Sequence, residues 1–386
     1  MYNLLPRLAR KHEIYLVCVS SAAPTEEQKT SLRACCEEVT HVPNGRLRAA
    51  LQCLMALPTR TPMRMAYAES KMGSGVVRQL LENTKPDVIY VERWRALQYV
   101  PEDTEVPVVC DPTDSMTLYN RRLKSEGAWW ERLVGSLEYR RFLQYEAKLA
   151  RRADISVFCS RLDMQCVREQ APEVRCEVVP NGVDCDKFFF KDATEEEPGT
   201  IVLTGNFKYR PNIHGANYFL DEIYPRIQKM LPGVEFAAVG NGAENALAQH
   251  RKRKGFKTVD FVADLRPYLA KATVAVAPLT VGAGVTNKLM EAFAVGTPIV
   301  ATPLACGDLP VNSGEHLLIG RDPEDFAENV VKLLKDAELR RRIAWRARGL
   351  VAEYDWELVA KKMECVLEEA IGEKAGTSPR QSAALA

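Results

Sequence analysis

The chain has 386 residues, of which 46% are hydrophobic and 27% are charged, and these values are ordinary for a soluble globular protein. This length is sufficient for two domains with full cores. The 52 lysines and arginines nearly balance the 51 aspartates and glutamates, which leaves a formal net charge of +1. Because nucleic-acid-binding proteins usually carry a strong basic field, the balance argues against a nucleic-acid partner.

The cysteines and histidines predict a reducing compartment and no metal site. Eleven cysteines are present without a single C-x-x-C pair, and the five histidines are scattered along the chain. No apolar run reaches eighteen residues, and the opening sequence MYNLLPRLARKHE lacks the apolar core of a signal peptide. We therefore expect a cytoplasmic protein, with peripheral attachment to the inner membrane as an open alternative.

The first half of the chain alternates apolar runs with helical patterns. Residues 2–11 read as a helix and residues 13–19 as a buried strand, and a second helical segment covers residues 25–37. Short apolar runs then recur at residues 39–42, 87–91, 106–110, 155–159 and 176–179. Strands that alternate with helices favour a parallel sheet, so this half is predicted to be a doubly wound domain.

Residues 120–152 form a long helical stretch that is rich in arginine, tyrosine and tryptophan, including Trp129 and Trp130. A basic aromatic helix of this kind can rest on a membrane surface or line an acceptor groove. The more common outcome is a solvated helix whose aromatic residues anchor it in the core, and we expect that outcome here.

The sequence CDPTDS at residues 110–115 follows a predicted strand. Ligands gather beyond the carboxyl ends of parallel strands, so Asp111 and Asp114 are candidates to orient an acceptor hydroxyl. Aspartate also caps helices well, and the two carboxylates have an equally good explanation as caps of the following helix.

The second half of the chain repeats the pattern of strands and helices. Pro180, Asn181 and Gly182 form a turn signal that predicts a domain boundary. Six apolar runs follow and predict a second doubly wound domain: residues 200–204, 234–239, 259–262, 274–277, 298–301 and 317–319. An amphipathic helix at residues 354–370 comes next, and the polar tail beyond it is expected to be disordered.

Residues 274–302, VAVAPLTVGAGVTNKLMEAFAVGTPIVAT, combine a strand, a glycine-rich turn, a helix and a further strand. Thr286 or Asn287 can cap a helix over residues 288–295, and Gly296 can end it. Lys288 and Glu291 lie three residues apart on one face near its first turn. A glycine turn that leads into a helix N-terminus directs free N–H groups at one point, which favours phosphate. An ordinary structural corner explains the same pattern equally well.

At this segment the sequence resembles the donor site of retaining GT-B glycosyltransferases of family 4, in which a G-x-G turn, a lysine and a helix glutamate precede an A-x-G-x-P strand. Two departures are visible. The family usually has a first glutamate eight positions before the second, where this chain has Ala283, and its members begin one strand and one glycine loop earlier. The resemblance extends over most of the chain, and its best match is to sugar transferases associated with bacterial exopolysaccharide systems.

The resemblance implies an α/β GT-B fold with two doubly wound Rossmann-like domains that face a cleft. Residues 1–182 would form the acceptor-side domain without its first strand, and residues 183–352 the nucleotide-sugar-binding domain. Residues 353–372 would form a crossover helix that packs back on the first domain, followed by a disordered tail at residues 373–386.

The resemblance also implies the roles of individual residues. Lys208 and Lys288 are the expected catalytic cations, and Asp111 and Asp114 are the acceptor-side candidates. The expected donor-binding residues come from glycine turns, from the residues that follow them and from the helix after residue 286: Gly205, Asn206, Arg210, Gly240, Phe261, Gly284, Val285, Thr286 and Glu291.

The implied function is that of a retaining hexosyltransferase in polysaccharide or glycoconjugate synthesis. Its expected partners are a UDP- or GDP-linked sugar and an acceptor sugar or lipid-linked sugar, without metal or cofactor. Two alternatives stay open: a degenerate GT-B protein that binds a nucleotide or a partner without turnover, and a GT-B sugar-nucleotide epimerase. Ala283 and the absent first strand favour the degenerate protein, whereas the scattered histidines argue against an epimerase.

Overall fold

The computed structural model describes residues 3–126, 129–188, 190, 196–281 and 287–374. The chain divides into two compact units. Unit 1 comprises Met1–Pro180 together with Glu357–Ala386, and unit 2 comprises Asn181–Trp356. The expected disordered tail lies almost entirely outside the described residues.

Unit 1 contains two parallel sheets, whereas the sequence predicted one. The smaller sheet pairs β1 (Tyr15–Ser20) with β2 (Glu38–Pro43). The larger sheet has the order β3-β4-β5-β6, formed by Ile89–Glu92, Val108–Thr113, Ile155–Phe158 and Cys176–Val178. All strand pairs are parallel, as the alternating pattern predicted, but within the described residues no strand joins β1 to β3.

The prediction that β1 is a buried strand was wrong. Its first and last residues are exposed and the four between them are only half-buried. Among the described residues β1 pairs with β2 alone, so one of its edges has no strand beside it. The helix before it, α1 (Leu5–Leu8), is a single turn and not the ten residues that the pattern indicated.

The core of unit 1 lies around β4 and β5. Val108, Val109 and Ile155 are buried in the sheet, and the rings of Trp94 and Phe158 pack edge to face beside them. Residues 108–110 of β4 and all of β5 are buried without alternation, as is typical of parallel sheets that are covered on both faces. The remaining helices before the sheet are α2 (Glu26–Arg33), α3 (Arg46–Ala56), α4 (Met63–Ala68) and α5 (Lys71–Thr84), and α6 (Trp94–Leu97) lies between β3 and β4.

The long helical stretch of unit 1 consists of two helices, α7 (Met116–Glu126) and α8 (Trp129–Ala150), followed after β5 by α9 (Arg161–Arg168). A Cβ atom on Gly135 would lie 2.8 Å from the backbone nitrogen of Lys124, so glycine permits the two helices to pack closely. The expectation that aromatic residues anchor the stretch in the core holds for Phe142 of α8, which is buried, but it was wrong for the two tryptophans. Trp129 is 80% exposed and Trp130 is also exposed.

Unit 2 is a six-stranded parallel sheet with the order β12-β11-β10-β7-β8-β9. Five of its strands lie where the sequence predicted them: Glu197–Thr204 (β7), Glu235–Val239 (β8), Ala272–Ala277 (β10), Ile299–Ala301 (β11) and Leu318–Ile319 (β12). The sixth, β9 (Phe256–Val259), shares only Val259 with the predicted run at residues 259–262, so the position of that strand was predicted wrongly. Strand β10 is buried along its whole length. Two apolar layers, one on each face, enclose the sheet, which explains its unbroken apolar runs.

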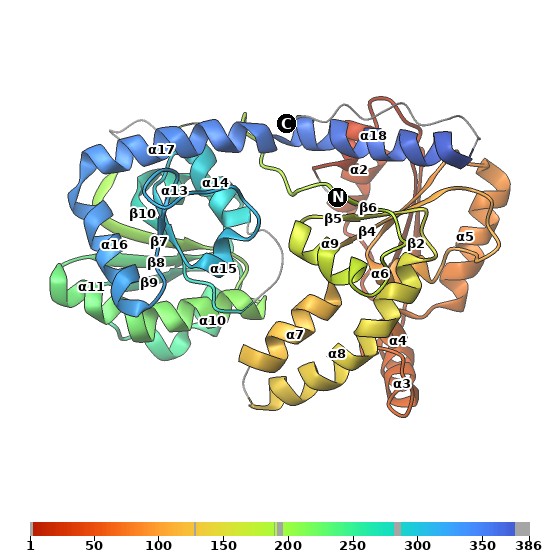
Figure 1. Ribbon diagram of the computed structural model, residues 1–386, viewed down its shortest axis with the longest axis horizontal. Helices are drawn as coiled ribbons and strands as arrows, with labels where there is room; N and C mark the ends of the chain where they lie inside the picture. Colours follow the sequence, from red (N-terminus) through yellow and green to blue (C-terminus); the bar gives the residue numbers. More distant parts are fainter. Residues whose placement is uncertain (1–2, 127–128, 189, 191–195, 282–286, 375–386) are drawn as a thin grey trace. The chain divides into compact units, whose positions relative to one another are not determined.

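Helices cover both faces of the unit 2 sheet (Figure 1). They are α10 (Arg210–Tyr218), α11 (Tyr224–Met230), α12 (Ala243–Ala246), α13 (Arg266–Lys271), α14 (Asn287–Val295), α15 (Pro303–Cys306), α16 (Pro323–Lys335) and α17 (Ala337–Val351). A single π-helical turn at Phe219–Ile223 joins α10 to α11. The prediction for α14 is confirmed, because Leu289, Ala292 and Phe293 are buried against the sheet and Gly296 follows the helix with φ +81°.

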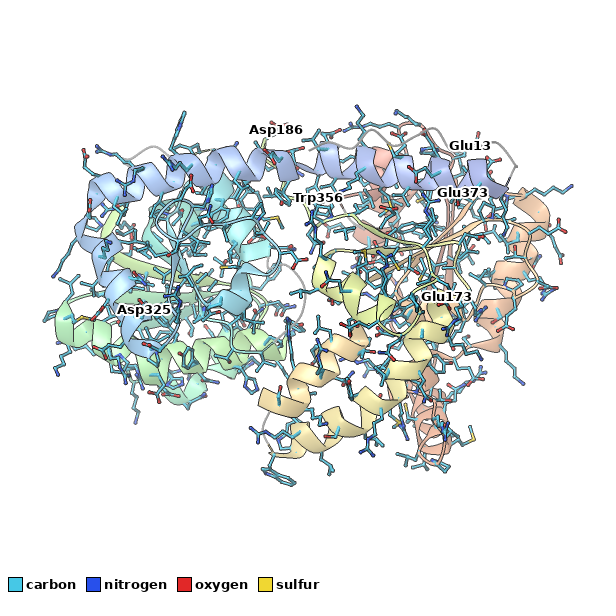
Figure 2. The ribbon with its side chains drawn as sticks, viewed as in Figure 1. Glu13, Glu173, Asp186, Asp325, Trp356 and Glu373 are labelled. Carbon is cyan, nitrogen blue, oxygen red and sulfur yellow. The ribbon has the colours of Figure 1, made fainter. Side chains whose placement is uncertain are left out.

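The last helix, α18 (Trp356–Lys374), belongs to unit 1 although it follows unit 2 in the sequence. It begins at Trp356 and ends just after Glu373, both of which are labelled in Figure 2. Its inner face buries Val359, Met363 and Val366. Arg175, next to β6, forms ion pairs with Glu369 and Glu373, so apolar packing and charge both bind this helix to unit 1.

Candidate active site

Two glycine turns meet at the carboxyl edge of the unit 2 sheet. Gly205 follows β7 and Gly240 follows β8, and the backbone nitrogen of Gly205 donates to the carbonyl of Val239 at 3.0 Å. A Cβ atom on Gly240 would lie 1.9 Å from the carbonyl oxygen of Gly205, and Gly240 has φ +139°. Only glycine fits there, because a side chain would collide with the first turn.

Lys288 lies directly beside the Gly205 turn. Its Nζ donates a hydrogen bond of 2.7 Å to Oδ1 of Asn212, and a Cβ atom on Gly205 would be 3.5 Å from the same Nζ. The Nδ2 of Asn212 donates at 2.9 Å to the carbonyl of Asn206, within the turn itself. The first turns of α10 and α14 thus hold an ammonium group against a glycine loop, an arrangement suited to a phosphate.

The sequence did not single out Asn212. It lies two residues after Arg210, the first residue of α10, in the segment TGNFKYRPN. The available signal was the proline at position 211, because proline in a first helical turn fixes where the helix begins. The residue one position later is therefore held at the helix N-terminus, beside the turn.

Burial shifts the pKa values of the two ionisable groups on α14. It lowers the pKa of the Lys288 amine to about 8, and it raises the pKa of the Glu291 carboxyl to about 7. The attraction between the two groups offsets part of each shift. A bound dianion would favour the charged form of the lysine.

Of the other predicted donor-site residues, Lys208 contacts the second turn. Lys208 is exposed, and its backbone nitrogen donates to Oδ1 of Asn206 at 3.0 Å, while its side chain lies against Gly242. Arg210 is exposed at the start of α10. Phe261 is 73% exposed. Asp260, which the sequence did not identify, accepts a hydrogen bond from the backbone nitrogen of Gly242 and fixes that turn.

Some predicted residues lie outside the part of the chain that the structure describes. These are Gly284, Val285 and Thr286, together with Ala283 at the position of the first glutamate. Asn287 is the first described residue of α14. The roles of the G-x-G turn therefore stay predictions.

The acceptor-side candidates lie at the carboxyl end of β4 in unit 1. Asp111 accepts hydrogen bonds from the Tyr90 hydroxyl at 2.6 Å and from the Thr113 backbone nitrogen at 2.8 Å. Burial raises its pKa, and the Tyr90 hydroxyl works in the opposite direction. Arg93 and Thr113, at the ends of neighbouring strands, both have positive φ angles of +75° and +70°. Such backbone strain gathers at functional sites.

Asp114 has a raised pKa of about 6, caused first by burial and then by repulsion from Asp163. The thiol of Cys159 donates to its Oδ1 at 3.4 Å. Ligand atoms of Asp114, Cys159 and Asp163 lie within 4.8 Å of one another. Asp163 already accepts hydrogen bonds from the Ser115 backbone nitrogen and the Ser160 hydroxyl, which fix its position.

Neither aspartate caps the following helix, which was one of the two explanations that the sequence left open. The Oγ of Ser115 accepts from the Leu118 nitrogen, and the buried Glu146 of α8 accepts from the backbone nitrogens of Met116 and Thr117. Glu146 also accepts from the indole nitrogen of Trp94 at 2.9 Å. Because Glu146 comes from a distant part of the chain, local pattern could not reveal it.

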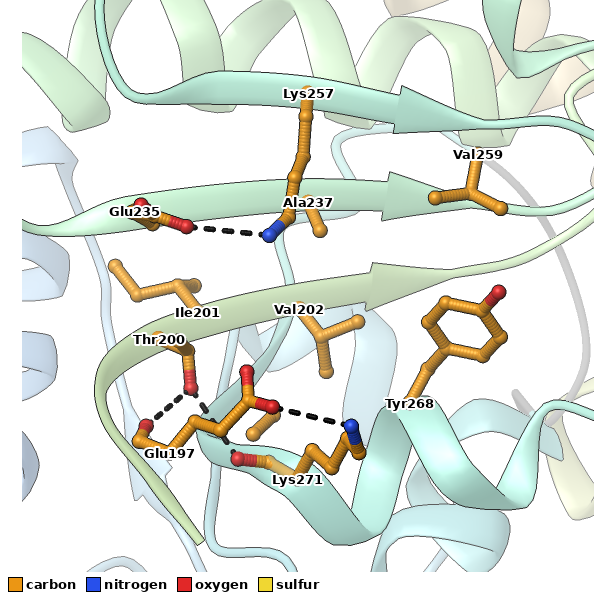
Figure 3. Close-up of a pocket in the computed structure, with 11 residues that line it drawn as sticks. Glu197, Thr200, Ile201, Val202, Glu235, Ala237, Lys257, Val259, Tyr268 and Lys271 are labelled. Carbon is orange, nitrogen blue, oxygen red and sulfur yellow. Dashed lines mark hydrogen bonds and ion pairs between the residues drawn. The ribbon is translucent and has the colours of Figure 1, made fainter.

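A separate pocket lies on the unit 2 sheet, lined by β7, β8, β9 and α13 (Figure 3). Two ion pairs of 3.1 Å border it, Lys257 with Glu235 and Lys271 with Glu197. None of the predicted donor-site residues lines this pocket. Glu197 and Glu235 begin their strands, whereas the glycine turns follow the strand ends, so the pocket is distinct from the candidate site.

No helix in the described part of the chain has the length and apolar character needed to cross a bilayer.

Two family models match the chain. The glycosyl transferase 4-like domain matches residues 1–182, and the glycosyl transferases group 1 model matches residues 198–336. Together these matches cover most of both units.

Several curated proteins are similar in sequence. The phosphatidyl-myo-inositol mannosyltransferase of Mycobacterium tuberculosis is 29% identical over 242 residues, covering 58% of this chain and 61% of that protein. An uncharacterized 44.6 kDa protein in the cps region of Klebsiella pneumoniae is 21% identical over 360 residues, with 89% of this chain and 88% of that protein covered. The chain spans less than two thirds of the length of the mannosyltransferases that it matches.

Solved structures share the fold. HepE of Anabaena, in complex with UDP and glucose, superposes with a TM-score of 0.67 at 15% identity and covers 95% of both chains. The sucrose-phosphate synthase of Thermosynechococcus elongatus gives a TM-score of 0.65 at 15% identity, over 94% of this chain and all of that one. The chain has two parallel-sheet units, it matches both family models, and it shares its fold with these neighbours. It therefore belongs to the GT-B glycosyltransferases of the family 4 type.

Proposed function

We propose that this protein transfers a sugar from a nucleotide diphosphate sugar to an acceptor hydroxyl, with retention of the anomeric configuration. The observation that carries the proposal is the position of the Lys288 ammonium, held by Asn212 against the Gly205 turn. Negative charge builds on the diphosphate as the glycosidic bond breaks, and a fixed cation beside backbone N–H groups stabilises that charge.

The other donor-site residues have complementary roles in this proposal. Glu291, three residues after Lys288, accepts hydrogen bonds from the ribose hydroxyls. Lys208 and Arg210 add positive charge near the phosphates, and Phe261 borders the base. UDP-linked and GDP-linked sugars are the proposed donors. Support for a UDP donor comes from HepE, which shares this fold and was solved in complex with UDP-glucose.

Unit 1 supplies the acceptor side. Asp114, with a pKa of about 6, is mostly ionised at neutral pH and can accept a proton or hydrogen bond from an acceptor hydroxyl. Asp111 is fixed beside it by Tyr90 and Thr113. The proposed acceptor is a sugar or a lipid-linked sugar, in line with the phosphatidyl-myo-inositol mannosyltransferases among the relatives.

We further propose a cytoplasmic protein that acts in polysaccharide or glycoconjugate synthesis, in peripheral contact with the inner membrane. No metal ion has a role in the proposed reaction. The charge that a metal would neutralise is instead assigned to Lys288, Lys208 and Arg210.

The test is to incubate the protein with UDP-, GDP- and ADP-sugars and to measure thermal protection and donor hydrolysis together. We expect one nucleotide class to raise the unfolding temperature and its sugar donor to be hydrolysed slowly. Product NMR with an accepted acceptor then shows whether the anomeric configuration is retained. Protection without any turnover would instead support a degenerate GT-B protein, and interconversion of the donor sugar would support an epimerase.

Two lysine variants make the test specific. Lys288→Ala removes the ammonium beside the Gly205 turn and should abolish both protection and hydrolysis. Lys257→Ala, whose lysine pairs with Glu235 at the strand starts, is the matched control and should retain both. Equal loss in the two variants, or no protection of the unaltered protein by any nucleotide, would overturn the donor-site assignment.

A further inference from the structure

Helix α3 of unit 1 presents an apolar face to solvent. Leu47, Leu51, Leu54 and Met55 are 85%, 62%, 63% and 67% exposed, and their spacing places them on one side of the helix. The opposite side, which includes Ala49 and Ala56, is buried. This is the reverse of the usual arrangement in a water-soluble helix, because the large side chains point outward and the small ones inward.

The first turns of α8 repeat this pattern. Trp129, Leu133, Val134 and Leu137 are all exposed and fall on one side of the helix, and Trp130 is exposed beside them. Further along the same side, the outward residues become polar, beginning with Arg140. The apolar stretch is therefore confined to one end of the helix.

A buried ion pair holds α3 and α8 together. Arg141 and Glu138, one turn apart on α8, pair at 3.0 Å while both are buried. The guanidinium of Arg141 donates to the carbonyl of Leu57 at 2.7 Å, just after α3, and Oε2 of Glu138 accepts from the backbone nitrogen of Met63 at 3.0 Å. Both helices extend to the same side of unit 1, away from its sheets (Figure 1).

Within residues 44–68 and the described part of α8, the exposed charged side chains are all basic. Residues 44–68 contain no aspartate or glutamate but four arginines, all exposed or partly exposed: Arg46, Arg48, Arg60 and Arg64. The three glutamates of α8 are buried, whereas Arg140 is exposed. We name the exposed apolar and basic residues of 44–68 and α8 the basic apolar surface.

We propose that the basic apolar surface docks the protein on a membrane that contains anionic lipids. Aromatic and aliphatic side chains of α3 and α8 would enter the interface between headgroups and acyl chains, and the arginines would lie among the phosphates. Basic residues near an anionic leaflet add an attraction that hydrophobic burial alone does not provide. The proposal rests on the peripheral membrane contact proposed above and assigns that contact to one surface and one lipid class, but it does not depend on sugar transfer.

A second copy of the chain fits this surface less well than a membrane does. In a symmetric dimer built on the same patch, each arginine cluster would face the other copy's cluster. The described part of the surface exposes no carboxylate to pair with them. An anionic lipid surface supplies both the apolar layer and the opposite charge.

The test is sedimentation of the purified protein with vesicles, without any nucleotide sugar. We expect strong binding to vesicles of equal parts phosphatidylcholine and phosphatidylglycerol, weak binding to phosphatidylcholine alone, and release at high salt because screening weakens the arginine contacts. Leu51→Glu with Leu54→Glu, and separately Arg46→Glu with Arg48→Glu, should each weaken binding by about tenfold or more. All four residues are exposed, so the variants should fold normally.

Matched controls carry the same substitutions elsewhere. Leu358→Glu alters an exposed leucine of α18, and Arg341→Glu with Arg342→Glu reverses two exposed arginines of α17. These proteins should bind vesicles as the unaltered chain does. Equal weakening in the controls, equal binding to both vesicle types, or a dimer that only the surface variants dissociate would overturn the proposal. Because no donor is present, a failure here leaves the proposed sugar transfer to its own test.

Discussion

Lys288 depends on one neutral neighbour for its position. Among the described residues, the side-chain oxygen that accepts a hydrogen bond from its Nζ is Oδ1 of Asn212, at 2.7 Å. Asn212 in turn donates to the carbonyl of Asn206. Asn212 is therefore a positioning residue, which acts on the donor through the lysine that it orients.

Replacing Asn212 by alanine should lower kcat/KM by about tenfold to a hundredfold, since a hydrogen bond to a charged group contributes roughly 1.5–3 kcal/mol. Thermal stability should change less than activity, because Asn212 and Lys288 are only half-buried and water can replace the lost amide. Asn217→Ala is the control, since Asn217 lies on the same helix but bonds to Gln249 and His250. Steady-state kinetics that show equal effects for both variants would contradict the assigned role.

Glu291 should make folding stability depend on pH. Its pKa is about 7 in the folded protein and 4.5 for an unperturbed glutamate, because burial disfavours the charged form. Between these values the folded state keeps a proton that the unfolded state releases, so the contribution of Glu291 to stability falls as the pH rises. Lys288, with its pKa lowered to about 8, acts in a separate window, and there stability rises with pH.

The Glu291→Gln variant tests this linkage. Relative to the unaltered protein, its free energy of unfolding should increase between about pH 5 and pH 7, as measured by urea denaturation. Glu328→Gln, on an exposed position of α16, should show no such change. A constant difference between Glu291→Gln and the unaltered protein across this range would show that the carboxyl is not perturbed.

Sequence reasoning found the residues whose signal is local and missed those whose partners are distant. Lys288, Glu291 and Gly205 were identified from a glycine turn and a helix start, and the structure brings Lys288 and Gly205 together. Glu146 and Asp260 were missed, because each bonds to backbone groups 18 or more positions away. Spacing along the chain carries no information about such contacts.

At the scale of elements, the two glycine turns of unit 2 form one structure. Gly240 lies so close to the carbonyl of Gly205 that the conformation of the turn after β8 depends on the position of the turn after β7. Asp260, just after β9, fixes the second turn through Gly242. Residues that follow the three neighbouring strands β7, β8 and β9 thus form the two turns at the carboxyl edge of the unit 2 sheet.

Gly240→Ala should destabilise unit 2 by about 3 kcal/mol or more, since a methyl group would collide with backbone at a position of positive φ. Gly233→Ala is a sharp control, because Gly233 has φ +90° but a Cβ atom added there would have nothing within 4 Å. It carries the conformational strain without the collision, so urea denaturation should show a smaller loss of about 1 kcal/mol. Equal losses would mean that the close approach of the turns has no energetic importance.

Most strands were predictable from apolar runs, whereas their grouping into sheets was not. Five of the six strands of unit 2 were identified at their positions, because apolar layers cover both faces of the sheet, whereas β9 begins three residues before its predicted run. In unit 1 the strands were also found, but β1 is half-exposed and its sheet is separate. An apolar run shows that a strand exists, yet it does not show which strand lies beside it.

For the whole molecule, α18 makes unit 1 discontinuous in sequence. The helix buries Val359 and Met363, and Glu364 pairs with Lys11 at 2.9 Å. A chain that ends at Trp356 should therefore keep unit 2 folded and lose much of the stability of unit 1. Hydrogen exchange should show increased exchange in β3 to β6 and unchanged exchange in β7 to β12. A chain that ends at Lys374 is the control, and equal protection in both would contradict the assigned role of α18.

The two passages of the chain between the units run side by side. The backbone nitrogen of Val183 donates to the carbonyl of Tyr354 at 3.0 Å, and that of Trp356 donates to the carbonyl of Val183 at 3.1 Å. Because the chain leaves unit 1, forms unit 2 and then returns to unit 1, the two units are completed at different times during biosynthesis. Unit 2 is a continuous segment and can fold as soon as it leaves the ribosome, whereas unit 1 must wait for its last helix. The domain that is translated first is thus completed last, and until then its α18-binding surface is exposed to chaperones and proteases.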